Sequence, residues 1–125
     1  MRKSNGVTGI VAVCGIAAML FSAPATAQTS AEFYKGKTID FVVGSGAGGG
    51  YDIYARLLAR RMGEHIPDNP TLIVRNVVGG GGIRASALLY NVSPHDGSVI
   101  ATVSRAMITA PVLGVEAAKF DAGKF

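Results

Sequence analysis

The stretch Thr38–Gly50, which reads TIDFVVGSGAGGG, decides the fold class of this chain. Its first part, Thr38–Val43, has the length and the β-branched content of a buried strand. Five of the next seven residues are glycine. A buried strand that runs directly into a glycine-rich loop is typical of the start of an α/β unit.

The residues after this stretch predict a helix over Tyr51–Glu64. Asp52 is the predicted N-cap. The apolar residues that recur at helical spacing are Ile53, Leu57, Leu58 and Met62, and we expect this face to lie against a sheet. His65–Pro70 contains two prolines, Asp and Asn, and is predicted to be a connecting loop.

The same order of elements then repeats. Thr71–Val74 is a second predicted strand, Asn76–Gly82 is a second glycine cluster and Ile83–Tyr90 is a shorter predicted helix. The composition of Ser93–Gly97 indicates a turn, and Val99–Val103 is a third predicted strand. Strands that alternate with helices predict an α/β fold with a mainly parallel sheet.

The pattern weakens after the third predicted strand. Met107–Leu113 has the composition of a helix that Pro111 interrupts. Val115–Phe125 has no clear period, so the sequence predicts no regular element there.

The first 27 residues have the pattern of a secretory signal peptide. A basic start at Arg2 and Lys3 is followed by the apolar stretch Val7–Phe21 and by Ala25–Ala27, a small-x-small cleavage site. A transmembrane anchor is the alternative, but an anchor needs about 20 apolar residues, and Val7–Phe21 has only 15. Cys14, the only cysteine, lies inside this segment. The sequence therefore predicts an exported chain of residues 28–125 with neither a disulfide nor a cysteine nucleophile.

Charge and composition limit the function of residues 28–125. Ten basic and eight acidic residues leave a net charge of +2, and no run of Lys and Arg exceeds two residues. A nucleic-acid surface is therefore not expected. His65 and His95 lie in different predicted loops, without a cysteine or a pair of carboxylates, so the sequence predicts no metal site and no cofactor. The weak positive charge of residues 28–125 suits a small anionic ligand.

The two glycine clusters are the predicted binding site. Each cluster follows the carboxyl end of a strand and precedes the amino end of a helix, where ligands bind in open α/β sheets. Unpaired backbone N–H groups and the positive end of the helix dipole attract a carboxylate or phosphate there. The competing interpretation is that the glycines only allow tight turns and close packing between helix and sheet.

The first cluster also matches a dinucleotide-binding motif. Gly44–Gly49 fits G-x-G-x-x-G and lies between a predicted strand and a predicted helix. The acidic residue expected for the ribose is missing, because Arg75 and Asn76 follow the second predicted strand. A nucleotide-binding or NAD(P)-dependent oxidoreductase domain therefore stays as the alternative.

Three motifs carry a resemblance to a known family. They are Gly48–Arg56 (GGGYDIYAR), Asn76–Gly82 (NVVGGGG) and Pro94–Gly97 (PHDG). Their order and spacing resemble the N-terminal part of the periplasmic solute-binding receptors of tripartite tricarboxylate transporters, the Bug family. The chain departs from the family pattern at Gly44 and Ser45, where a proline and an aromatic residue are frequent.

The resemblance implies an α/β fold of the type II periplasmic-binding-protein kind. Residues 28–125 would be a partial N-terminal lobe, with the second lobe missing. The implied function is that of a receptor and not an enzyme: it would capture a small organic carboxylate in the periplasm and deliver it to the membrane components of a transporter. Neither a cofactor nor a nucleic-acid partner is implied.

The resemblance also assigns the ligand-binding residues. Two sets from the glycine clusters would face the ligand, together with Asp52 at the head of the helix and Ser104 after the third strand. The first set is Ser45, Ala47, Gly48 and Gly49, and the second is Gly79, Gly80, Gly81 and Gly82.

Overall fold

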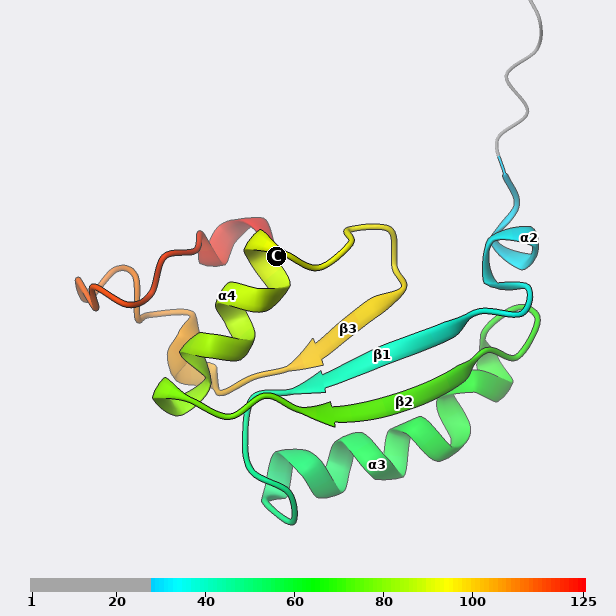
Figure 1. Cartoon of the computed structure of the whole chain (residues 1–125), viewed down its shortest axis with the longest axis horizontal. Coiled ribbons are helices and arrows are strands. Elements are labelled where there is room, and N and C mark those ends of the chain that lie inside the picture. The colour runs from blue at the N-terminus through cyan, green and yellow to red at the C-terminus, as the bar shows by residue number, and fades with distance from the viewer. Residues whose placement is uncertain (1–27) are drawn as a thin grey trace, which may run out of the picture.

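The computed structural model describes residues 28–125, so the predicted signal peptide lies outside the described residues. This part of the chain contains three strands and three α-helices, arranged as in Figure 1. In chain order the elements are α2 (Ser30–Tyr34), β1 (Thr38–Val43), α3 (Gly50–Met62), β2 (Thr71–Asn76), α4 (Ile83–Asn91) and β3 (Val99–Thr102).

The strands form one parallel sheet in the order β2-β1-β3. This confirms the predicted α/β class with a parallel sheet. The predicted bounds of β1 are confirmed at both ends, whereas β2 continues two residues beyond the prediction, to Asn76. Asn76 is the register partner of Val43, so the last residues of β1 and β2 lie side by side.

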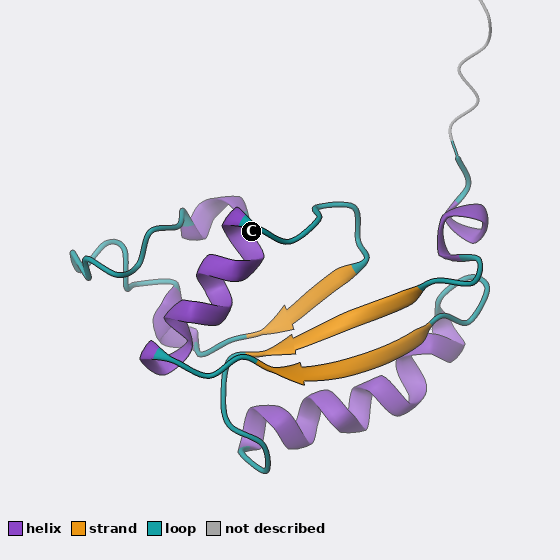
Figure 2. Ribbon diagram, in the orientation of Figure 1, coloured by secondary structure: helices purple, strands orange, loops and turns teal. Residues whose placement is uncertain are grey.

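The two longer helices cover opposite faces of the sheet (Figure 2). On the α3 face, Ile39, Phe41 and Val43 pack with Ala55. Val42, which alternates with them along β1, is also fully buried. Burial of β1 on both faces toward its carboxyl end explains the continuous apolar run Phe41–Val43.

Helix α3 packs with a face that shares only Met62 with the predicted one. Ile53, Leu57 and Leu58 are each more than half exposed, so their predicted position against the sheet is wrong. The buried positions are Asp52 and Ala55. Asp52 is hydrogen-bonded to loop atoms and to β2, and this turns its side of the helix inward. The small alanine on the same side allows close contact with the sheet.

The segment after β3 contains turns where a helix was predicted. A single 3-10 turn, Arg105–Met107, is followed by further turns through Gly114, so the helix predicted over Met107–Leu113 is absent from the described residues. This segment buries Met107 and Phe120 in a second cluster against α4. It therefore extends the layer on the α4 side.

Helix α2 was not predicted, although its sequence contains a capping box. The Thr29 hydroxyl accepts a hydrogen bond from the Glu32 N–H, and the Glu32 carboxylate accepts one from the Thr29 N–H. At one turn in length, the helix is too short for apolar periodicity to reveal it. None of the helices between residues 28 and 125 has the length and apolar character needed to cross a membrane.

Candidate functional site

The carboxyl ends of the three strands meet at one edge of the sheet. The Val77 N–H donates to the Val43 carbonyl at 2.8 Å, and the Gly44 N–H donates to the Thr102 carbonyl at 2.9 Å. From this edge the chain leaves β1 toward α3 on one face, and leaves β3 toward the segment that packs with α4 on the other. Ligands of open α/β sheets bind where the connections of neighbouring strands diverge in this way.

A cavity of about 370 Å³ opens at this edge, within the size range of small-molecule sites. We call Gly44–Gly49 the first glycine loop and Val77–Gly82 the second. Both loops, Tyr51 of α3 and Ser104, the second residue after β3, contribute to the wall. The lining residues are Gly44, Ser45, Gly46, Tyr51, Val78, Gly79, Gly81 and Ser104.

Backbone amides supply most of the hydrogen-bond donors of this wall. Within residues 28–125, the N–H groups of at least five lining residues donate to no other group: Ser45, Gly46, Val78, Gly79 and Ser104. The Ser45 Oγ is buried and has no hydrogen-bond partner among the described residues. Such a buried group costs free energy until it is paired, and the amides beside it are open to the cavity, so the wall favours a ligand that accepts hydrogen bonds.

A polar network behind the cavity fixes the shape of the first glycine loop. The Asp52 carboxylate accepts hydrogen bonds from the Gly48 N–H at 2.8 Å, the Arg56 Nε at 3.0 Å and the Asn76 Nδ2 at 2.8 Å. The same Asn76 amide group donates to the Ser45 carbonyl at 3.0 Å, and its Oδ1 accepts from the Arg56 Nη2. Asn76 therefore ties the end of β2 to the first glycine loop.

These contacts determine the charge state of Asp52. The carboxylate is 2% exposed, and the hydrogen bond from Arg56, then those from Gly48 and Asn76, hold its pKa well below the ordinary value. The same pairing raises the pKa of Arg56. Asp52 is thus a carboxylate neutralised by Arg56, and it adds little repulsion toward an anion in the cavity.

The predicted capping role of Asp52 is wrong. The N-cap of α3 is Gly49, which makes no side-chain cap, and Asp52 is the third residue of the helix. Its side chain reaches back to the Gly48 N–H, one residue before the N-cap. An acidic residue is favourable in the first turn of a helix as well as at the N-cap. The sequence therefore placed Asp52 correctly near the start of the helix, but at the N-cap instead of the third helical position.

The structure brings four of the predicted ligand-binding residues together in the cavity wall: Ser45, Gly79, Gly81 and Ser104. The Ser104 hydroxyl also accepts a hydrogen bond from the Ala106 N–H at 3.3 Å, so it caps the 3-10 turn after β3.

The other six predicted residues lie outside the wall: Ala47, Gly48, Gly49, Asp52, Gly80 and Gly82. Gly48 and Asp52 bond to each other behind the cavity. Gly82 is buried, and a Cβ there would lie 3.5 Å from the Met107 side chain. Gly48, Asp52 and Gly82 therefore support the loops from behind.

Sequence reasoning missed three features of the site. Tyr51 and Val78 line the cavity, and Asn76 ties the end of β2 to the first glycine loop. Tyr51 belongs to the first turn of the helix that follows the first glycine loop, so the sequence could have placed it beside the cavity. The role of Asn76 depends on the pairing of β1 with β2, which the sequence does not reveal.

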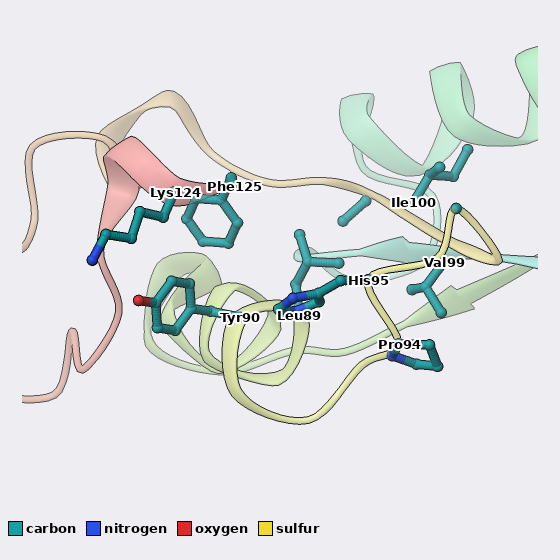
Figure 3. Close-up of a pocket in the computed structure, with 10 residues that line it drawn as sticks. Leu89, Tyr90, Pro94, His95, Val99, Ile100, Lys124 and Phe125 are labelled. Atoms are coloured by element: carbon teal, nitrogen blue, oxygen red, sulfur yellow. The ribbon is translucent and has the colours of Figure 1, made fainter. Parts of the chain in front are cut away.

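A second cavity, of about 410 Å³, lies between α4, the turn before β3 and the end of the chain (Figure 3). The Tyr90 and Phe125 rings meet there edge-on, with centroids 5.9 Å apart. Lys124 also lines this cavity and is paired with Asp121 at 3.4 Å. The cavity is mainly apolar and receives no residue from either glycine loop. The cavity between the glycine loops is therefore the candidate site.

Metal chemistry has little support in the described part of the chain. No group of three or more His, Cys, Asp and Glu side chains suited to a metal ion occurs in residues 28–125. The His95 Nε2 lies 3.3 Å from the Leu89 carbonyl, and His65 belongs to a 3-10 turn after α3.

Comparisons of the chain with models of protein families, with curated proteins and with solved structures found no match. The resemblance to the receptors of tripartite tricarboxylate transporters therefore stays a prediction from the three sequence motifs.

Proposed function

We propose that this chain is an exported solute-binding receptor that captures a small organic carboxylate. It would act in the periplasm, as a lobe of the type II periplasmic-binding-protein kind, and deliver its ligand to the membrane components of a tripartite tricarboxylate-type transporter. The observation that carries the proposal is the cavity of about 370 Å³ bordered by at least five backbone N–H groups without partners within residues 28–125.

The chemistry of the cavity suits a carboxylate. Its oxygens accept charge-assisted hydrogen bonds from backbone amides, and glycine lets the ligand approach the backbone closely. The N-terminus of α3 adds a positive partial charge beside the first glycine loop. Because Arg56 neutralises Asp52, the acidic side chain nearest to this loop does not oppose the ligand.

We propose a binding protein and not an enzyme. The wall of the cavity consists of glycines, two serines, Tyr51 and Val78, with no His, Cys, Asp or Glu among these described residues. General acid–base catalysis depends mainly on such side chains, and the two serines have no base among the wall residues to activate them as nucleophiles.

The strand order does not favour the alternative of a dinucleotide-binding domain. In the classic dinucleotide fold the third strand lies beside the second, whereas here β3 lies beside β1. The side chain of Asn76, at the end of β2, is bound to Asp52 and Arg56 and is not free for a ribose.

Calorimetric titration of the purified full chain tests the proposal. The ligands are acetate, benzoate, succinate and citrate, with NAD and NADP as the competing class. Binding of at least one carboxylate without binding of the dinucleotides supports the proposal. Binding of a dinucleotide without any carboxylate contradicts it.

A pair of matched variants locates the binding. Gly46 lines the cavity and Gly50 does not; a Cβ at either position meets no atom within 4 Å, and neither has a positive φ. Gly46→Leu fills the cavity and should weaken carboxylate binding about ten-fold or more, whereas Gly50→Leu should leave it unchanged. Equal effects of the two variants would place the ligand elsewhere.

A further inference from the structure

The wall of the candidate cavity has one polar and one apolar part. The polar part includes the wall amides without partners within residues 28–125, those of Ser45, Gly46, Val78, Gly79 and Ser104. The two bulky side chains of the wall are Tyr51, which is 40% exposed, and Val78, which is 52% exposed. Exposed apolar surface beside a set of free donors suits a ligand with an anionic end and an apolar body.

Positive side chains are missing from the described wall. None of its residues is Lys, Arg or His. Arg56, behind the first glycine loop, already donates to Asp52 and Asn76. A first carboxylate on the ligand can use the backbone amides, but a second or third would lose its water without gaining a cation.

We propose that this cavity selects monocarboxylates with a flat apolar body, such as an aromatic ring, over di- and tricarboxylates, and that Tyr51 and Val78 determine this specificity. The inference rests on the proposed carboxylate-binding function. The phenol ring of Tyr51 offers a face for a second ring, and the branched side chain of Val78 adds apolar contact.

Titration of the full chain at fixed ionic strength tests the selectivity. Benzoate should bind about ten-fold more tightly than acetate, and more tightly than succinate or citrate. Tighter binding of citrate or succinate would overturn this inference and leave the proposed function standing. If no carboxylate binds, the proposed function itself fails.

Variants of Tyr51 separate a specificity role from a structural one. Tyr51→Ala should weaken benzoate binding about five- to ten-fold and leave acetate binding unchanged, and Tyr51→Phe should retain the preference. The control is Tyr54→Ala, because Tyr54 is 70% exposed on the same helix and does not line the cavity. A loss of benzoate and acetate affinity by the same factor in Tyr51→Ala would contradict the proposal.

A gain of function gives an independent check. Val78→Arg places a cation at the wall, so the affinity for succinate should rise about ten-fold relative to that for benzoate. An unchanged ratio of the two affinities would count against a role of Val78 in selecting the ligand.

Discussion

The two glycine loops share a composition but hold their shapes by different means. Only Gly48 has a positive φ in the first loop, and side chains fix that loop: Asp52 binds the Gly48 N–H and Asn76 binds the Ser45 carbonyl. In the second loop Gly79 to Gly82 all have positive φ, and no side chain of residues 28–125 hydrogen-bonds to it.

This difference shows that glycine serves two purposes here. In the first loop it provides room: a Cβ at Gly44 would lie 3.3 Å from both the Ala85 and the Val103 side chains. In the second loop it provides backbone conformations that other residues rarely adopt. The first loop should therefore depend most on its polar network, and the second on the glycines themselves.

Removal of the Asp52 carboxylate is the most severe test of the first loop. Asp52→Ala leaves the Gly48 N–H, the Arg56 guanidinium and the Asn76 amide without their acceptor, so the melting temperature should fall by about 10 °C or more. The control is Asp40→Ala, which breaks one exposed pair with Arg75 and should shift the melting temperature by about 4 °C or less. If thermal denaturation showed similar shifts of the melting temperature for the two variants, the role assigned to Asp52 would be contradicted.

The same carboxylate predicts a dependence on pH. The pKa of Asp52 is lower in the folded than in the unfolded chain, so its ionised form stabilises the fold above the ordinary pKa of 3.8. This stabilisation should be lost as the pH falls below about 4, because the unfolded chain then binds a proton that the folded chain does not. In urea denaturation, the free energies of unfolding of the native chain and of Asp52→Asn should differ less below that pH than above it. A constant difference down to pH 2.5 would be evidence against the linkage.

Gly82 tests the second loop. Its φ of 113° is unfavourable for any residue with a Cβ, so Gly82→Ala should lower the free energy of unfolding by about 2 kcal/mol. Gly81, at φ 63° and ψ 19°, lies in the left-handed region that asparagine tolerates. Gly81→Asn should therefore be less destabilising than Gly81→Ala in urea denaturation, and the opposite order would contradict a conformational role for this glycine.

The smallest effect is expected at Gly46 of the first loop. A Cβ there meets no atom within 4 Å and φ is not positive, so Gly46→Ala should change the free energy of unfolding by about +0.5 kcal/mol, through the lower entropy of the unfolded chain. If Gly46→Ala lowered the free energy of unfolding by more than about 1 kcal/mol in urea denaturation, the two loops would not differ in their dependence on glycine.

Sequence periodicity was sufficient for the elements that lie at the centre of the fold. The bounds of β1, the parallel sheet and the position of both glycine loops were predicted, because buried strands and glycine-rich turns have strong local signals. The orientation of α3 was not predicted. Its most apolar face points to solvent, since the hydrogen bonds of Asp52 and the small side chain of Ala55 set the packed face.

The site was predicted in outline and missed in detail. The glycine clusters pointed to the edge of the sheet where the candidate cavity opens, but the sequence could not distinguish residues of the wall from those behind it. The contact of Asn76 with Ser45 arises because β1 and β2 end side by side, and the order β2-β1-β3 does not follow from the alternation of strands and helices alone.

The central position of β1 also affects when the chain can fold. β1 is the first of the three strands to be synthesised, yet its partners are Thr71–Asn76 and Val99–Thr102. Neither of its edges is paired until these later residues have left the ribosome, and the entropy of closing the intervening segments must be overcome first. The nascent chain should therefore remain extended through most of its synthesis, in a form that can be threaded through a membrane.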